Sequence, residues 1–321
     1  MAQPVLEVRD LRTRFALHGG DIEVVRGVDL SIAPSEMLGL IGESGSGKTV
    51  TGLSVLRLLP MNARVSSAAM RFKGVELQSL SDRQFRALRG RSLAMIFQDP
   101  VGAFNPAKRV DWHLCEVIRR RQGAEAEWAA AAHDALQALG IARPERVLHL
   151  FPHQLSGGMA QRILIAMVLA LEPDLVIADE PTTNLDNIVE RQILGLFRRL
   201  QSRLQAAFLF ITHDMSVAAA LCNRIAVMYA GQIVEIGPTA QVFGAPGHPY
   251  TQGLIATATA LKGRVDRLKE IAGELPNLAA PPPGCLFSPR CAQAMDRCRT
   301  TEPPMFGEPP HKVRCYLAEP K

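Results

Sequence analysis

Residues Gly42–Thr49 read GESGSGKT and match the pattern G-x-x-x-x-G-K-S/T. Glycines let backbone N–H groups converge on phosphate oxygens, and a helix start adds partial positive charge. Lys48 can reach β- and γ-phosphates, and the Thr49 hydroxyl can ligate Mg²⁺. We therefore expect a nucleoside triphosphate to bind at all eight loop residues: Gly42, Glu43, Ser44, Gly45, Ser46, Gly47, Lys48 and Thr49.

A second group of polar residues follows two apolar runs. Asp179 and Glu180 end the run LVIADE, and His213 follows FLFIT. Ligands of open α/β sheets bind at the carboxyl ends of strands. Asp179 is placed to hold Mg²⁺ through water, and Glu180 to orient or deprotonate a water that attacks the γ-phosphate. The competing interpretations are a solvated acidic turn and a structural histidine.

Alternating strands and helices are predicted to position these residues. Apolar runs or period-two alternation indicate strands, and wider apolar spacing indicates helices. This order predicts an α/β domain with a mainly parallel sheet. The predicted strands are Val5–Val8, Val28–Ile32, Met37–Ile41, Leu175–Ala178 and Phe208–Thr212, with a hairpin of Arg224–Tyr229 and Gln232–Ile236. Helical stretches are predicted at Thr49–Leu59, which Pro60 closes, over most of residues 83–171, and at Ile188–Leu204.

The composition is that of a globular protein. Of 321 residues, 47% are hydrophobic, and 36 Lys and Arg against 31 Asp and Glu give a net charge of +5. This excludes a disordered or collagen-like chain, and the mild basic excess does not choose between a nucleotide, an anionic lipid surface and nucleic acid. No signal peptide is expected, and the longest apolar run, Ile163–Leu171, is about half a membrane span. We expect a soluble, cytosolic chain that reaches a membrane only through a partner.

Five motifs stand in one order: GESGSGKT, Gln98 within IFQDP, Leu155–Met159 (LSGGM), the acidic strand, and Ile211–Asp214 (ITHD). Together they resemble the ATP-binding-cassette ATPases over residues 4–255. The sequence His248–Thr251 (HPYT), followed by a Pro- and Cys-rich tail, resembles the dipeptide/oligopeptide/nickel importer family. The resemblance implies a P-loop NTPase with a RecA-like α/β core, an antiparallel β subdomain and a helical subdomain at about residues 91–170. It also implies a cassette at residues 1–255 and a small Cys-rich extension at 256–321.

The resemblance implies a role for each matching residue. Lys48 and Thr49 hold phosphates and Mg²⁺, and Asp179 assists the metal. Gln98 senses Mg²⁺ and water, Glu180 is the catalytic carboxylate, and His213 is the switch histidine. Phe15 lies where the family places an aromatic that stacks on adenine, although a core phenylalanine is the alternative.

The LSGG segment, which is the signature motif of this family, has a different role. Ser156, Gly157 and Gly158 cap an ATP that is held by the opposite subunit, so hydrolysis implies a dimer with two sandwiched ATP molecules. Asp186 helps to join the two halves.

Some positions depart from the family pattern. Asn184 replaces a small residue, Asn187 and Ile188 replace an aliphatic and a small hydroxyl residue, and Ala160 stands where Arg is common. The phosphate, metal and water ligands are intact, so we expect a competent site.

Four cysteines, Cys285, Cys291, Cys298 and Cys315, follow C-x5-C-x6-C-x16-C. Four thiolates can hold zinc or an iron–sulfur cluster. The spacing lacks tight C-x(2–4)-C knuckles and therefore favours a cluster, and some similar peptide-importer ATPases carry 4Fe–4S here. Zinc and unliganded thiols remain alternatives.

The expected function is an ATPase that energises an importer of di- or oligopeptides or related solutes. The implied partners are a second cassette (identical or homologous), two permeases and, indirectly, a solute-binding protein, at the cytoplasmic face of the inner (plasma) membrane. The alternatives are a soluble cassette ATPase that acts on DNA or ribosomes and a non-hydrolysing regulatory cassette. The sequence contains no coiled-coil or zinc-finger insertion, and its basic residues form no stripe. It therefore gives no support to nucleic acid as a partner.

Overall fold

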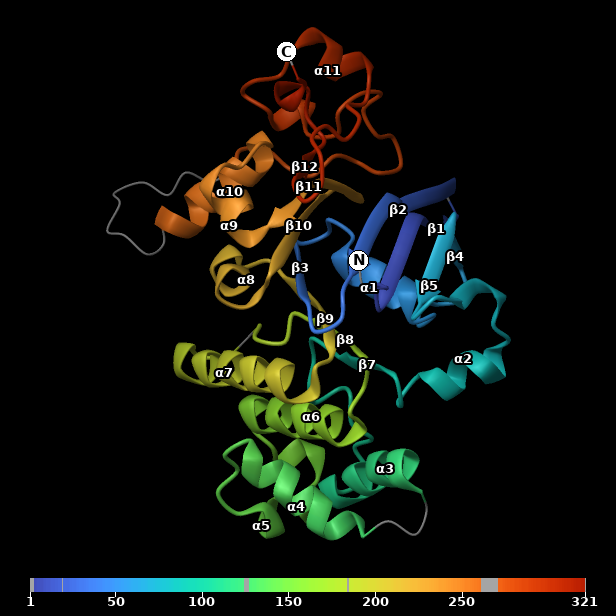
Figure 1. Cartoon of the computed structure of the whole chain (residues 1–321), viewed down its shortest axis with the longest axis vertical. Coiled ribbons are helices and arrows are strands. Elements are labelled where there is room, and N and C mark those ends of the chain that lie inside the picture. The colour runs from blue at the N-terminus through green and yellow to red at the C-terminus, as the bar shows by residue number, and fades with distance from the viewer. Residues whose placement is uncertain (1–2, 19, 124–126, 184, 261–270, 321) are drawn as a thin grey trace. The chain divides into compact units, whose positions relative to one another are not determined.

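The computed structural model describes residues 3–18, 20–123, 127–183, 185–260 and 271–320 (Figure 1). The chain divides into two compact units. The first comprises residues 1–5, 33–35 and 76–209, and the second comprises residues 6–32, 36–75 and 210–321. Asn184, one of the positions that depart from the family pattern, lies outside the described residues. Residues 261–270 of the predicted extension also lie outside them.

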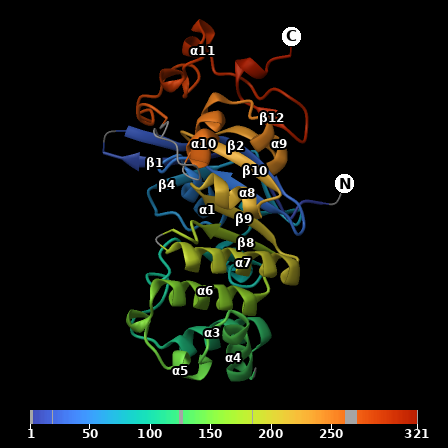
Figure 2. The same cartoon turned by 90° about the vertical axis from the view of Figure 1, so that its left-hand side faces the viewer.

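The first unit consists mainly of helices, which confirms the predicted helical middle of the chain. Helices α3, α4 and α6 pack against one another, and α6 also contacts α7 (Figures 1 and 2). Strands β7 and β8 pair in parallel, with Ile96 opposite Ala178. The elements are α2 (Asp82–Leu88), β7 (Leu93–Ile96), α3 (Val110–Gln122), α4 (Trp128–Ala138), α5 (Pro144–Leu148), α6 (Gly157–Leu171), β8 (Leu175–Asp179) and α7 (Asn187–Leu204).

The second unit contains an antiparallel sheet near its N-terminal end. Strand β1 (Leu6–Leu17) pairs with β2 (Gly20–Ile32), β4 (Ala63–Ser66) and β5 (Ala69–Phe72). The two predicted strands in this region are therefore confirmed, but both are longer than their alternating segments. The register of β1 and β2 shifts at several positions, and these irregularities interrupt the strict alternation that a sequence pattern detects.

The other sheet strands of the second unit position the phosphate-binding loop. Strand β10 (Arg224–Tyr229) lies parallel to β3 (Met37–Ile41) and antiparallel to β11 (Gln232–Pro238), which confirms the predicted hairpin. Every residue of β3 is buried, as expected for an apolar strand with both faces covered. Strand β9 (Ala207–Thr212) is also buried along its whole length. The helices are α1 (Lys48–Val55), α8 (Met215–Leu221), α9 (Thr239–Gly244), α10 (Pro249–Ala260) and α11 (Asp296–Thr300).

Helix α1 ends earlier than Pro60 predicts. Arg57 adopts a left-handed conformation with φ 50°, its N–H donates to Ser54 O, and the Leu58 N–H donates to Leu53 O. This pair of bonds satisfies the last carbonyl groups of the helix as a Schellman motif, with arginine in the position that glycine usually takes. The predicted helix Thr49–Leu59 is therefore correct in type and too long by four residues at its end.

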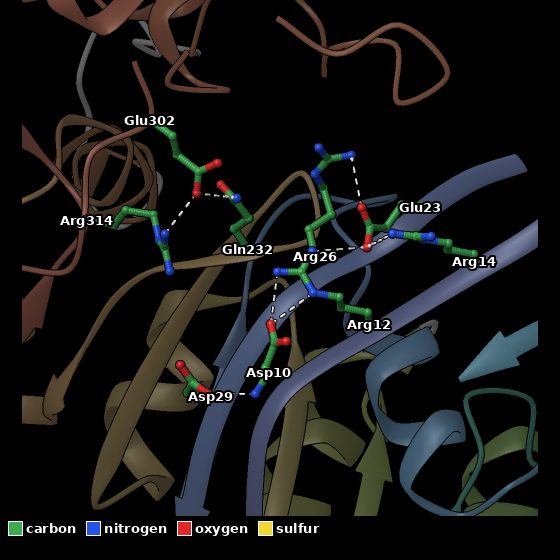
Figure 3. A network of polar contacts seen from close by, with 9 residues as sticks. All are labelled: Asp10, Arg12, Arg14, Glu23, Arg26, Asp29, Gln232, Glu302 and Arg314. Carbon is green, nitrogen blue, oxygen red and sulfur yellow. Dashed lines mark hydrogen bonds and ion pairs between the residues drawn. The ribbon is translucent and has the colours of Figure 1, made fainter. Parts of the chain in front are cut away.

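The C-terminal segment attaches to β11. Strand β12 (Lys312–Val313) pairs with it, and the Arg314 N–H donates to Val234 O. Glu302 accepts hydrogen bonds from Gln232 at 2.7 Å and from Arg314 at 2.9 Å, as Figure 3 shows beside the ion pairs of β1 and β2. These contacts order a segment that has little secondary structure of its own.

None of the described helices combines the length and the apolar character that crossing a bilayer requires.

Candidate functional site

The phosphate-binding loop joins β3 to α1, the predicted strand–loop–helix arrangement. Two of its glycines are required by space: a Cβ on Gly42 would clash with Met228 O, and a Cβ on Gly47 would lie 2.9 Å from Val24 O. Gly47 also has φ 103°, a conformation that side chains rarely adopt. The loop is fixed further by the Gly231 N–H, which donates to Ser46 O. Close backbone packing thus fixes the curvature of the loop.

Lys48 and Thr49 occupy the first turn of α1. The Lys48 ammonium donates to Gly42 O at 2.8 Å and to Glu43 O at 2.9 Å, so the side chain folds back across the loop. The N-cap residue of the helix, Gly47, provides no side-chain cap. A cation and the start of a helix therefore lie at one place, which is the chemistry that binds an oxyanion.

Phe15 lies in the same unit as the phosphate-binding loop. It is half-buried on β1, where its neighbours across the sheet are Ile22 and Ala63. Two residues earlier, the Thr13 hydroxyl lies 2.8 Å from the Ser54 hydroxyl of α1. The strand that carries Phe15 is thus tied to the helix that follows the loop; its stacking on adenine stays a prediction.

In the first unit the structure brings Gln98 and Glu180 together. Both follow the carboxyl ends of the parallel strands β7 and β8, and the Gln98 amide donates to Glu180 Oε2 at 3.3 Å. The Thr183 hydroxyl donates to the same oxygen at 2.9 Å, a partner that the sequence interpretation missed. Asp179, one residue earlier, is buried at the end of β8, whereas Glu180 has φ 44° and is partly exposed. Asp179 and Glu180 are adjacent in the sequence but therefore lie in different environments.

The signature residues surround the start of α6. Ser156 is the N-cap, and its hydroxyl accepts from the Met159 N–H at 3.3 Å. A Cβ on Gly158 would meet Val189 Cγ1 at 2.9 Å, whereas a Cβ on Gly157 would meet nothing within 4 Å. The missing side chain at Gly158 thus leaves room for Val189, whereas a side chain at Gly157 would point into open space. Ala160 is fully buried, which accounts for a small residue at that position.

Asp186 and His213 lie beside helix starts. Asp186 is the N-cap of α7, and its carboxylate accepts from the N–H groups of Ile188 and Val189, each at 3.0 Å. His213 follows β9, is exposed, and precedes Asp214, the N-cap of α8. Asp186 therefore has a structural task in addition to the predicted one between subunits.

The HPYT motif supports the phosphate-binding loop through hydrogen bonds, a task that the sequence did not predict. Glu235, fully buried, accepts from the N–H groups of Gly247 at 2.9 Å and His248 at 3.0 Å. His248 Nδ1 accepts from the Tyr250 N–H at 3.0 Å, and the Tyr250 hydroxyl accepts from the Glu43 N–H at 2.8 Å. The buried carboxylate therefore holds the motif, and the motif holds the loop.

The four C-terminal cysteines line one small cavity of about 10 Å³, together with His248 and Phe287. The Cys285 N–H donates to Cys298 O at 2.8 Å. Burial raises the pKa of Cys285 to about 11 and also raises the pKa values of Cys291 and Cys315. In the described part of the chain, no group of three or more His, Cys, Asp or Glu residues has an arrangement that could hold a metal ion. The predicted convergence of the thiols is observed, but metal-binding geometry is not.

Comparison with known proteins identifies the family. Residues 25–183 match the ABC transporter family, and residues 234–298 match the family described as oligopeptide/dipeptide transporter, C-terminal region. The chain is similar to the oligopeptide transport ATP-binding protein OppD of Bacillus subtilis (strain 168), with 41% identity over 98% of this chain and 89% of that protein. It is equally similar to the dipeptide transport ATP-binding protein DppD of the same organism, with 41% identity over 99% of this chain and 96% of that protein.

Solved structures share the fold. The chain resembles cbiO1 from Clostridium perfringens, part of the ABC transporter complex cbiONQ, with a TM-score of 0.63 and 26% identity over 75% of this chain and 91% of that one. It also resembles the dimeric bacterial ABC transporter cassette MJ0796, with a TM-score of 0.66 and 23% identity over 73% of this chain and 98% of that one. The predicted α/β cassette fold is thus confirmed. The chain belongs to the ATP-binding-cassette ATPases of the oligopeptide and dipeptide transporter family.

Proposed function

We propose that this chain binds ATP at Gly42–Thr49 and hydrolyses it with Glu180 as the catalytic carboxylate. Lys48 and the loop N–H groups bind the β- and γ-phosphates, Phe15 stacks on adenine, and His213 contacts the γ-phosphate. Glu180 orients the attacking water and accepts its proton. The Gln98–Glu180 hydrogen bond at the ends of adjacent parallel strands is the observation that carries this assignment.

Thr49, Asp179 and Gln98 would hold Mg²⁺ in this proposal. Their hydroxyl, carboxylate and amide oxygens are the kind of ligand that this hard cation prefers. The Gln98 amide nitrogen donates to Glu180, so the amide oxygen of Gln98 is the atom that would coordinate the metal. When bound, Mg²⁺ neutralises charge on the phosphate oxygens.

We propose that two cassettes, identical or homologous, close around ATP. Ser156, Gly157 and Gly158 would cap the nucleotide held by the opposite subunit, and Asp186 would lie near the dimer contact. The open space beside Gly157 and its place at the start of α6 support this role, because backbone N–H groups at a helix start attract an anion. The dimeric state named for the similar cassette MJ0796 agrees with it.

The relatives' names supply the proposed cargo and partners. As OppD and DppD are named for oligopeptide and dipeptide transport, we propose that this cassette powers the import of such peptides. It would dock on two permeases at the cytoplasmic face of the inner (plasma) membrane and serve a solute-binding protein only indirectly, with no nucleic acid partner. The proposed division is a cassette at residues 1–255 and an extension at 256–321.

We further propose that Cys285, Cys291, Cys298 and Cys315 hold a 4Fe–4S cluster. The support is that all four thiols line one cavity and that thiolate is the donor such clusters require. Iron and acid-labile sulfide measured after anaerobic purification test the assignment. Cluster-free, fully active protein, or stoichiometric zinc in place of iron, would contradict it.

The function itself is tested by expressing the chain with its permeases and measuring ATP hydrolysis and peptide uptake in membranes. Glu180→Gln is expected to keep ATP binding and to lower kcat by about 10²–10⁴-fold, the usual contribution of a positioned base. Glu172→Gln is the matched control, since Glu172 is exposed and forms an ion pair with Arg121 at the surface. Equal hydrolysis by the Glu180 variant and the wild type would refute the role of Glu180.

A further inference from the structure

Arg290 forms an ion pair with Glu43 of the phosphate-binding loop, in which the arginine is buried and the glutamate is partly exposed. The Arg290 side chain is 5% exposed, and its two terminal nitrogens lie 2.7 and 3.0 Å from the two carboxylate oxygens of Glu43. The residues are 247 positions apart in the sequence, and Arg290 belongs to the segment that carries Cys285 and Cys291. Bidentate contacts between a guanidinium and a carboxylate are among the strong ion pairs, whereas exposed ion pairs with a single contact contribute little.

The rest of the guanidinium is also occupied. Its Nε donates to Ala272 O at 2.9 Å, and Nη2 donates to Ile271 O at 2.9 Å as well as to Glu43. The group stacks near Tyr229 and Phe287, with its central carbon 5.7 and 6.0 Å from the two ring centres. The arginine therefore cannot follow a moving glutamate; it fixes the position of the Glu43 carboxylate.

Glu43 is held at three separate groups. Its N–H donates to the Tyr250 hydroxyl, its carbonyl accepts from Lys48, and its carboxylate binds Arg290. A second C-terminal residue approaches the same loop, because a Cβ on Gly45 would lie 3.4 Å from Leu275 Cδ1. Contacts from the C-terminal segment thus hold the first half of the loop.

We propose that Arg290 is a positioning residue for nucleotide binding. By fixing Glu43 it holds the phosphate-binding loop in the curvature that places its N–H groups on the phosphates, so the C-terminal extension is a working part of the ATP site. This inference rests on the proposed nucleotide-binding function of Gly42–Thr49. It is distinct from the cysteine proposal, because it requires no occupant in the cysteine cavity.

The test compares full-length variants by calorimetric titration with Mg-ATP and by steady-state hydrolysis in the assembled complex. Arg290→Ala is expected to weaken ATP affinity about tenfold and to raise KM with little change in kcat, because the loss of a partly buried charged hydrogen bond is of that size. Arg290→Lys, which keeps the charge without the forked geometry, is expected to lose about threefold. Arg297→Ala is the control, since Arg297 pairs with Glu319 in the same extension and should leave affinity unchanged.

A double-mutant cycle separates positioning from general destabilisation. If Arg290 acts through Glu43, adding Arg290→Ala to Glu43→Ala produces no further loss of affinity. Full addition of the two effects, or wild-type affinity in a folded Arg290→Ala or Arg290→Lys variant, overturns the proposal. Failure of the wild type itself to bind Mg-ATP would instead refute the proposed function, on which the inference depends. If Arg290→Ala does not fold, the same comparison of ATP affinities is made with Arg290→Lys, alone and combined with Glu43→Ala.

Discussion

Protonation of His248 is predicted to destabilise the second unit as the pH falls. The ring is almost fully buried, and Nδ1 accepts a hydrogen bond from the Tyr250 N–H, so a proton on Nδ1 would break that bond. Desolvation lowers the pKa of His248 from 6.5 to about 3. The neighbouring Glu235 carboxylate is engaged by two backbone N–H groups and lies 2.8 Å from His311 Nε2.

The sign and size follow from proton linkage. Since the folded-state pKa is lowered, the unfolded chain binds more protons below pH 6.5, and stability declines as the pH falls. From about pH 8 to about pH 5, this one group removes about 2 kcal/mol from the free energy of unfolding. The figure changes little for any folded-state pKa below about 4, because the unfolded chain carries nearly all of the titration in this range.

The assay is denaturant unfolding of the full chain at both pH values. All three tyrosines lie in the second unit and both tryptophans in the first, so tyrosine signals report the unit that contains His248. His248→Asn keeps an acceptor for the Tyr250 N–H but cannot titrate, and it is expected to remove about 2 kcal/mol of the pH dependence. His18→Asn, at an exposed position of the same unit, is the control.

The same pH dependence in His248→Asn as in the wild type would refute this reasoning. An equal loss of pH dependence in His18→Asn would also refute it.

Three further predictions concern the loop and the helix starts. Tyr250→Phe leaves the Glu43 N–H without its acceptor and should cost about 1–3 kcal/mol of stability in thermal unfolding; an unchanged midpoint would contradict the support assigned to the HPYT motif. Gly157→Ala should fold with unchanged stability yet impair hydrolysis in the assembled complex, whereas Gly158→Ala should lower stability; the reverse order would contradict the cap at α6. Asp186→Ala should cost about 1 kcal/mol and Asp186→Asn much less, because asparagine still caps a helix; equal losses would argue against the capping role.

Local chemistry was predictable from the sequence. The loop Gly42–Thr49 could be placed between a strand and a helix because an apolar run enters it and helical spacing leaves it. The pairing of Gln98 with Glu180 was not predicted, because residues 83–171 were expected to be mostly helical and strand β7, which ends beside β8, was missed. The role of Gln98 came only from the family resemblance.

Contacts between distant residues were not predictable. Tyr250 lies 207 positions from Glu43, and Arg290 lies 247 positions from it, and no periodicity indicates which remote side chains meet. The HPYT motif was the available signal, but its residue types alone do not reveal a hydrogen bond to the loop. The end of α1 was missed for a different reason: Arg57, not glycine, takes the left-handed position.

The central claim is that the loop Gly42–Thr49 binds the triphosphate of ATP, and calorimetric titration tests it most directly. The full-length wild type is predicted to bind ATP with an affinity that depends on Mg²⁺, and Lys48→Ala is predicted to lose that binding while it remains folded. Absence of Mg²⁺-dependent binding in the wild type, or equal affinity in the Lys48 variant, would contradict the account.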